Sequence, residues 1–402
     1  MKKFLKKNFK KIKEIRFDLF TDFIESEKSS GYLLVMITII SMVVANSNLG
    51  QDYLKIWHTY LDLSFSKIQL NYNIEYWIND GLMAIFFLLV GLEIEREIYD
   101  GELSTLKKAS LPAIAALGGM LIPALIHFMF NAGTPSQRGF GIPMATDIAF
   151  TLGVLSLLGK RIPFSLKIFI TALAIIDDLG AIVIIALFYS SNLSMAYLLG
   201  AMGVFAILLI MNRSHVNRLS PYLILGVLMW YLMLKSGVHA TISGVLLAFA
   251  IPFNKKSDKN ISDTLEKRLH KPVAFFILPL FALANTAIVI PENIFASLIG
   301  NNSLGIICGL VIGKPLGIFI FSYLAIKIGI GLLPEDLNWQ ILLGGASLAG
   351  IGFTMSIFIT NLAFNNLEIV TDSKLSIILA SSLSAFIGLF ILNRAVRINK
   401  KV

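Results

Sequence analysis

Thr171-Ala-Leu-Ala-Ile-Ile-Asp-Asp-Leu-Gly180 places two adjacent acids, Asp177 and Asp178, in the middle of an apolar run over 164–190. The run suits a membrane-spanning helix, which needs about 20 mostly apolar residues. Carboxylates at that depth are energetically unfavourable, and an ionisable group inside a membrane segment indicates a functional site. We therefore expect this pair to bind something within the membrane.

The composition of the whole chain is that of a polytopic membrane protein. Of its 402 residues, 56% are hydrophobic and 15% are charged, whereas a soluble domain has about 25% charged residues. The net charge of +9 is compatible with nucleic acid, but the basic residues lie in short connections between apolar runs, where they report orientation. We expect a lipid bilayer, no nucleic acid and no cofactor.

Twelve apolar runs predict twelve transmembrane helices, with the N- and C-termini both in the cytoplasm. Most of the 34 Lys and Arg residues then fall in cytoplasmic segments, as the positive-inside rule requires. The predicted spans are 31–47, 75–98, 110–130, 139–159, 164–190, 195–211, 220–236, 239–253, 272–290, 304–327, 339–363 and 374–393.

The chain divides into a short cytoplasmic segment and one transmembrane domain. In 1–30, apolar residues recur at helical spacing between lysines, which is typical of an amphipathic helix on the membrane surface; a disordered basic tail is the alternative for its first ten residues. The transmembrane domain covers 31–402. We expect its core in 110–190 and 304–393, and a second part, the panel that carries a dimer contact, in 31–98 and 195–290.

One outer connection, 62–73, has alternating apolar and polar residues and predicts a short periplasmic β-hairpin that turns near Ser66-Lys67. A lone hairpin exposes unpaired edges, which a second chain can cover by strand addition. We therefore expect a homodimer through this hairpin. The alternative is an irregular loop on the membrane surface.

The fourth span, 139–159, is interrupted. Pro143 removes a backbone donor and obstructs the preceding turn. The freed polar groups of the backbone cannot face lipid, so this helix is broken and lines a cavity inside the protein. Thr146 and Asp147 lie at the break.

The eleventh span, 339–363, has a comparable interruption around Gly350 and Gly352. Each interrupted span is the middle member of three, in 110–190 and in 304–393, and the two sets enter the membrane with opposite polarity. Paired interruptions of this kind point to the binding site of an inverted-repeat transporter. Two glycine-rich helices packed closely are the alternative, and Asp147 beside the first break favours the transporter.

Crossing two broken helices brings like helix ends together. Two N-termini face each other, and so do two C-termini, and each end is equivalent to about half a charge. The sequence offers an acid, Asp147, for the positive pair and a base, Lys314 in the tenth span, for the negative pair.

Several motifs, in the same order along the chain, resemble those of the bacterial NhaA sodium/proton antiporters. The resemblance covers nearly all of the chain after residue 31. The motifs are Phe86-Phe-Leu-Leu-Val-Gly-Leu-Glu93, Ala145-Thr-Asp-Ile-Ala-Phe150, Ile175-Ile-Asp-Asp-Leu-Gly180, Gly237-Val-His-Ala-Thr241, Gly313-Lys-Pro-Leu-Gly317 and Gly350-Ile-Gly-Phe-Thr-Met-Ser-Ile-Phe358.

The resemblance implies a Na⁺ or Li⁺/H⁺ exchanger of the bacterial inner membrane that works by alternating access and is not an enzyme. In the family, the position of Asp178 binds the cation, Asp177 is tied to Lys314, and Asp147 with Thr146 completes the cation surroundings. The positions linked to pH response and to pH homeostasis are Glu93, Arg96, Glu97, His239, Glu266 and His270. From spacing alone, ordinary surface ion pairs are the favoured interpretation of Glu93, Arg96 and Glu97 and of Glu266 with His270. The resemblance reverses this preference for Glu93 and His270.

Elementary chemistry agrees with this mechanism. Na⁺ prefers oxygen ligands, which carboxylates, a hydroxyl and unwound backbone provide. Protons compete for the same carboxylate oxygens, so cation binding expels protons, and protonation expels the cation. Adjacent helical residues point about 100° apart, so Asp178 can meet the cation while Asp177 meets Lys314.

Two other functions use buried acids in membranes. A cation channel needs no coupling to protons. An intramembrane aspartyl protease needs two carboxylates that share a proton across helices, for which Asp147 and Asp178 are the candidates, but the expected Gly-x-Gly-Asp signature is absent from the sequence.

Overall fold

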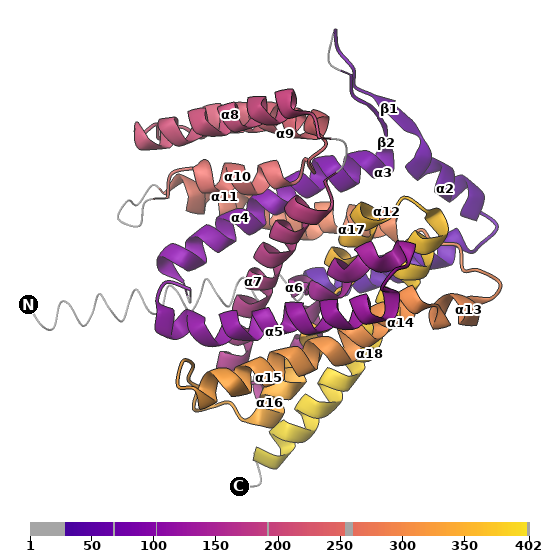
Figure 1. Ribbon diagram of the computed structural model, residues 1–402, viewed down its shortest axis with the longest axis vertical. Coiled ribbons are helices and arrows are strands. Elements are labelled where there is room, and N and C mark those ends of the chain that lie inside the picture. Colours follow the sequence, from indigo (N-terminus) through magenta and orange to yellow (C-terminus); the bar gives the residue numbers. More distant parts are fainter. Residues whose placement is uncertain (1–28, 67–68, 102, 191–192, 254–259, 400–402) are drawn as a thin grey trace, which may run out of the picture.

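A computed structural model describes residues 29–66, 69–101, 103–190, 193–253 and 260–399, and these are almost entirely helical (Figure 1). The amphipathic helix predicted in 1–30 lies outside the described residues, apart from its last two. The first described helix covers Ser29–Ala45. The elements that follow are α2 (Gly50–His58), β1 (Tyr60–Asp62), β2 (Asn71–Asn73), α3 (Ile74–Tyr76), the π-helical η1 (Trp77–Leu82) and α4 (Met83–Asp100).

The remaining elements are given in three groups, and the first of these includes the long span that carries the acid pair. The first group is α5 (Leu106–Asn131), the 3₁₀ helix η2 (Pro135–Met144), α6 (Ile148–Ser156), η3 (Gly159–Arg161) and α7 (Phe164–Phe188). The second is α8 (Met195–Arg213), α9 (Leu219–Ser236), α10 (Ile242–Ala250), α11 (Ile261–Pro272), the π-helical η4 (Val273–Ile277) and α12 (Leu278–Asn285). The last is α13 (Ile294–Ile299), α14 (Asn301–Cys308), the π-helical η5 (Gly309–Gly313), α15 (Lys314–Lys327), α16 (Trp339–Ala349), α17 (Phe353–Ala363) and α18 (Leu367–Asn399).

Seven helices of the described residues are long and apolar enough to cross a membrane, or up to ten if each sharply bent pair forms one span. The chain is therefore a multi-pass membrane protein, but length and composition do not reproduce the predicted count of twelve. The predicted span 239–253 is the clearest difference. Gly237, with φ of +83°, ends α9 in the left-handed conformation that glycine adopts readily, and α10 begins only at Ile242.

The predicted hairpin is present, but its two strands pair over only three residues each. β1 and β2 pair antiparallel with Tyr60 opposite Asn73 and Asp62 opposite Asn71. The ladder thus begins before position 62, and Leu63 extends it only by a hydrogen bond from its N–H to Leu70 O at 3.0 Å. The hairpin projects from the helices next to α2, an additional helix that the sequence did not predict (Figure 1).

Helix contacts separate the molecule into two groups (Figure 1). One group contains α4 and α8 to α12, and the other contains α5 and α14 to α18, with η2, α6 and α7 packed against the second group. The helices α5 and α15, which belong to the first spans of the two predicted sets of three, approach each other closely. A Cβ at Gly118 would lie 2.2 Å from Gly317 O, so only glycine allows these backbones to touch.

Candidate functional site

The two interrupted spans break where the sequence predicts. The helices η2 and α6 meet at a bend of 47° across Ala145–Asp147, and α16 and α17 meet at 43° across Gly350–Gly352. The breaks contact each other, because Asp147 N–H donates to Ile351 O at 2.8 Å. Gly350 also lets the second break lie against η5, since a Cβ there would lie 2.5 Å from Leu310 O.

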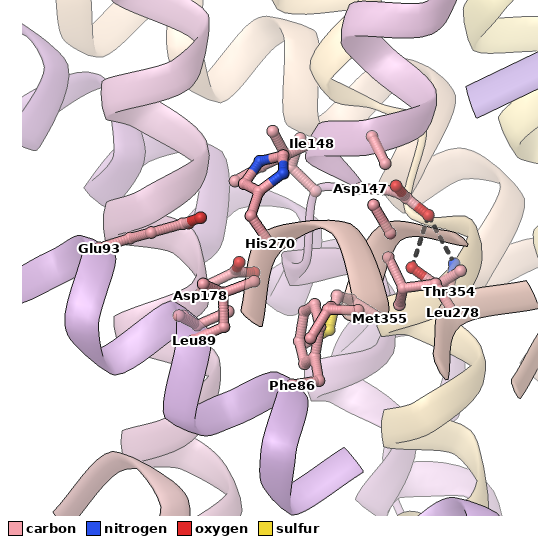
Figure 2. A pocket seen from close by; sticks show the side chains of 15 residues that line it. Phe86, Leu89, Glu93, Asp147, Ile148, Asp178, His270, Leu278, Thr354 and Met355 are labelled. Carbon is pink, nitrogen blue, oxygen red and sulfur yellow. Dashed lines mark hydrogen bonds between the residues drawn. The ribbon is translucent and has the colours of Figure 1, made fainter. Parts of the chain in front are cut away.

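Two helix N-termini meet at Asp147, which is 3% exposed. Its Oδ1 accepts from Phe150 N–H at 3.0 Å in the first turn of α6. Its Oδ2 accepts from the N–H of Thr354 at 3.0 Å and from its hydroxyl at 2.5 Å, in the first turn of α17 (Figure 2). One carboxylate thus caps a helix from each set and balances the positive ends of both.

One helix C-terminus contacts Lys314 directly, and a second lies close to it through Thr146. Its Nζ donates to the carbonyl of Met144, the last residue of η2, and lies 2.8 Å from Asp177 Oδ2. The hydroxyl of Thr146 lies 2.7 Å from the same Asp177 oxygen and 3.0 Å from the carbonyl of Ala349, the last residue of α16. The side chains of Lys314 and Asp177 are fully buried, so this ion pair holds the negative ends together away from water.

Asp178 turns away from that ion pair. It lines a cavity of about 50 Å³ that also borders Glu93, Asp147, His270 and Thr354 (Figure 2). The residue is 2% exposed, and among the described residues Asp178 Oδ1 has no hydrogen-bond partner. A buried carboxylate oxygen without a protein donor is available to a proton or a cation, and the volume exceeds that of a single water site.

Glu93 on α4 and His270 on α11 also line this cavity, and in Figure 2 the imidazole of His270 lies beside Ile148. The sequence linked both positions to pH response without placing them near the acid pair. The cavity therefore extends from the buried carboxylate toward α11.

Arg96 joins α4 to α11 at the edge of this region. Its guanidinium lies 2.9 Å from Glu266 Oε1 and 3.2 Å from Glu97 Oε1. The ion pair between Arg96 and Glu266 thus connects α4 to α11. By contrast, Lys267 pairs with Asp263 at 2.8 Å on the exposed face of α11, an ordinary surface ion pair.

Burial is the largest influence on Glu266 and raises its pKa above the ordinary range, while the positive charge of Arg96 opposes that rise. Asp263 and Glu97 raise the pKa of Glu266 further, and His270 lowers it. The protonation of Glu266 is consequently sensitive to the Arg96 contact.

His239 lies apart from the cavity, in the non-helical stretch between α9 and α10. Its Nε2 is 2.9 Å from the carbonyl of Tyr189 at the end of α7. It does not line the cavity of Asp178. The six positions assigned to pH response therefore occupy separate parts of the fold, and His239 belongs to none of the α4–α11 contacts.

Some site residues were not predicted. Thr354 supplies two hydrogen bonds to Asp147, and a threonine in the first turn after a glycine break was the available signal. Glu95, also missed, is 5% exposed and accepts from Ser262 Oγ at 3.0 Å, which adds a second link between α4 and α11. Its role depends on the packing of α11 against α4, which the sequence alone does not give.

Two contacting helix breaks, a buried lysine–carboxylate pair and a second carboxylate beside a cavity define a class of protein: a multi-pass membrane transporter of ions. The chain matches the Na⁺/H⁺ antiporter 1 family over residues 21–392. It therefore belongs to this family, whose members are transporters and not enzymes.

Named relatives are similar in sequence to this chain over almost its full length. A protein of Cytophaga hutchinsonii named Na⁺/H⁺ antiporter NhaA is 56% identical over 371 residues, covering 92% of this chain and 94% of the relative. A protein of the same name from Flavobacterium psychrophilum is 58% identical, covering 92% and 95%. One from Vibrio campbellii is 48% identical, covering 94% and 95%.

Proposed function

We propose that the protein exchanges cytoplasmic Na⁺ or Li⁺ for external protons, through competition of the cation and protons for Asp178. The observation that carries this proposal is the geometry of Asp178: a buried carboxylate with an unpartnered oxygen, facing a cavity. Family membership and the antiporter names of the relatives support the same reaction.

The two acids have different tasks in this mechanism. Asp178 holds either the cation or a proton, because both bind the same oxygens and neither can remain while the other is bound. Asp177 stays with Lys314, whose ammonium neutralises both the carboxylate and the C-terminus of η2. More than one proton moves per cation if this pair also exchanges a proton, and transport is then electrogenic.

Asp147 and Thr146 complete the oxygen surroundings of Na⁺. Both line the cavity with Asp178. Oxygen ligands from a carboxylate, a hydroxyl and unwound backbone suit this hard cation. Thr146 also contacts Asp177, so the cation site and the lysine pair share one residue and respond to each other. Pro143, Gly350 and Gly352 serve by keeping the two helices broken.

The α4–α11 contacts provide the pH response. Glu93 and His270 border the cavity, and Arg96 with Glu97 and Glu266 forms an ion-pair cluster beside it. A histidine and a buried acid change charge near neutral pH more readily than solvated acids do. His239 senses pH separately, at the end of α7. Through this response the protein supports pH homeostasis.

In the membrane, we place both termini in the cytoplasm of a bacterial inner membrane, with twelve spans and two broken helices that cross. The three spans in 110–190 and in 304–393 form the core, and 31–98 with 195–290 forms the panel. The exposed edges of β1 and β2 support a homodimer through the hairpin, because a second copy can extend such a two-stranded sheet.

The alternatives fit the site less well. A channel does not require a buried lysine–carboxylate pair beside its ion ligand. A protease dyad requires two carboxylates sharing a proton, whereas Asp147 accepts hydrogen bonds from two helix N-termini. Neither activity has support from the family or its named members.

The test is Na⁺- and Li⁺-dependent proton movement in everted membrane vesicles. Asp178→Asn keeps the shape of the side chain but removes the charge, and we expect it to abolish the exchange. The matched control is Asp52→Asn, a carboxylate on α2 that is 80% exposed and pairs only with Lys55. Exchange retained by Asp178→Asn at the level of the control would overturn the assignment.

A further inference from the structure

A second buried polar cluster lies at the hairpin end of the helices, and the mechanism above does not use it. Its centre is Asn285, the last residue of α12, which is fully buried. Its Nδ2 donates to Asn79 Oδ1 at 2.8 Å and to Phe281 O at 3.0 Å. Its Oδ1 accepts from Asn361 Nδ2 at 2.6 Å and from Lys374 Nζ at 3.3 Å. Every hydrogen-bonding position of this amide is thus occupied.

Lys374 brings a positive charge into the cluster. It is 7% exposed, near the start of α18, and its Nζ lies 3.9 Å from Glu75 Oε1 in α3. A buried ammonium is unfavourable unless it has partners, and here the partners come from α3 and α12, which are distant in sequence. The lysine therefore ties the start of α18 to two elements of the other helix group.

An aromatic layer separates this cluster from the acid pair. Phe358 has its ring centre 5.3 Å from that of Phe87 and 6.4 Å from that of Phe281, and each ring is at most 1% exposed. On α17, Thr354, Phe358 and Asn361 follow at spacings of four and three residues, so they share one face. Along that face the cavity, the aromatic layer and the polar cluster succeed one another.

We propose that Glu75, Asn79, Asn285, Asn361 and Lys374 form a lock that closes the route from the acid pair to the hairpin end. The lock joins two helix groups. Its first three residues lie on α3, η1 and α12; α3 packs on η1, and η1 contacts α4 and α12 of the first group. The last two residues lie on α17 and α18 of the second group. The cavity of Asp178 extends toward α11, and none of the five residues lines it. The cavity therefore reaches toward α11 and does not reach the lock.

A transporter of this kind needs a lock because its ion site must be exposed to the two sides of the membrane in turn. Inverted-repeat transporters do this by moving one helix bundle against another around a fixed site. Such a movement at the hairpin end must separate Asn361 and Lys374 from Asn285 and Glu75. These groups would then be buried without partners unless water reached them, so opening the lock and hydrating the route are one event.

The competing explanation is that the cluster only holds neighbouring helices together in one rigid unit. The two explanations differ in whether the Asn285–Asn361 contact has to open during transport. A covalent link across that contact distinguishes them, because a rigid unit tolerates the link and a lock does not.

The experiment joins Asn285→Cys to Asn361→Cys in a protein whose single cysteine is removed by Cys308→Ala. A short, reducible thiol cross-linker is added to proteoliposomes, and Na⁺/H⁺ exchange is measured before and after. We expect linking to reduce exchange at least about tenfold, because the outward state is no longer populated, and a reductant to restore it. Binding of ²²Na⁺ to the linked, solubilised protein should persist, since the cavity toward α11 stays open.

The matched control is Asn302→Cys with Ser373→Cys. These side chains are hydrogen bonded at 2.7 Å between α14 and α18, within one helix group and at the same end of the molecule. Linking them should leave exchange unchanged. Exchange that continues unchanged after full linking of positions 285 and 361 would overturn the lock.

This proposal rests on the proposed Na⁺/H⁺ exchange, which the unlinked Cys308→Ala parent tests independently in the same vesicles. A second measurement does not depend on the double variant. Asn285→Cys alone should react with a membrane-impermeant thiol reagent from the hairpin side several-fold faster during turnover than at rest, as expected for a site exposed only in the open state. Equal reaction rates in the two conditions would refute the lock even if every variant transports.

Discussion

The Lys314–Asp177 ion pair makes a prediction that separates two adjacent acids. Both side chains are fully buried and 2.8 Å apart. Lys314→Met leaves the Asp177 carboxylate buried without its counter-charge. Asp177→Asn likewise leaves the Lys314 ammonium buried without its counter-charge. Breaking a buried ion pair from one side costs about 3–5 kcal/mol. Asp178→Asn removes no recorded partner, because Asp178 Oδ1 has none among the described residues, so it should not lower stability.

These energies convert into a measurable shift of the melting temperature. With about 2.1 cal/mol/K of unfolding entropy per residue, a chain of 402 residues has about 0.8 kcal/mol/K. A loss of 3–5 kcal/mol then lowers the melting temperature by about 4–6 °C. A membrane protein unfolds less completely in detergent, so the entropy is smaller and the shift larger.

The assay is thermal denaturation of the purified protein in detergent at one pH, followed by size-exclusion chromatography. We expect Lys314→Met and Asp177→Asn each to melt lower, and the double variant to recover most of the loss, since two neutral groups replace two charges. Lys314→Arg should be milder than Lys314→Met. Equal melting of Asp177→Asn and Asp178→Asn, or additive losses in the double variant, would refute the reasoning.

Three further predictions concern other parts of the fold. Arg96→Ala removes the charge that opposes the raised pKa of Glu266; this acid then ionises only at higher pH, and we expect the pH profile of exchange to shift toward alkaline pH. Lys267→Ala, which breaks only a surface pair, should leave the profile unchanged, and the same shift in both variants would contradict the role of Arg96. Deletion of 63–72 should weaken dimers in native mass spectrometry more than it reduces transport, whereas an unaltered dimer would exclude the hairpin contact. Gly317→Val forces α5 and α15 apart, so it should lower the melting temperature by several degrees and reduce exchange; wild-type stability would refute the close approach.

Local chemistry in the sequence was sufficient to predict the main features of the site. Proline, glycine and an acid in one apolar run predicted a break at Thr146 and Asp147, and the helix indeed stops there. Helical geometry alone required Asp177 and Asp178 to diverge, and the first contacts Lys314 while the second faces the cavity. Each of these predictions depends on residues that are close together in the chain.

Features that depend on distant packing could not be predicted. Thr354 and Asp147 are separated by more than two hundred positions, and only the contact between the two breaks gives the threonine its role. Asn285 and Asn361 lie in runs that look merely apolar, and their amides find partners only because three helix ends converge. The late start of α10 was missed because a hydropathy pattern does not register the left-handed turn at Gly237.

The reciprocal capping of the broken helices has a consequence for biosynthesis. Lys314, made late in translation, neutralises the end of η2, which leaves the ribosome much earlier; Asp147, made early, caps α17, which leaves much later. Neither half can therefore supply all the partners of its own broken helix. The end of η2 stays in the membrane without the charge of Lys314 until the second half is inserted. An ancestral gene encoding one half alone would have needed a second copy of its product inserted in the opposite direction before either became a stable protein.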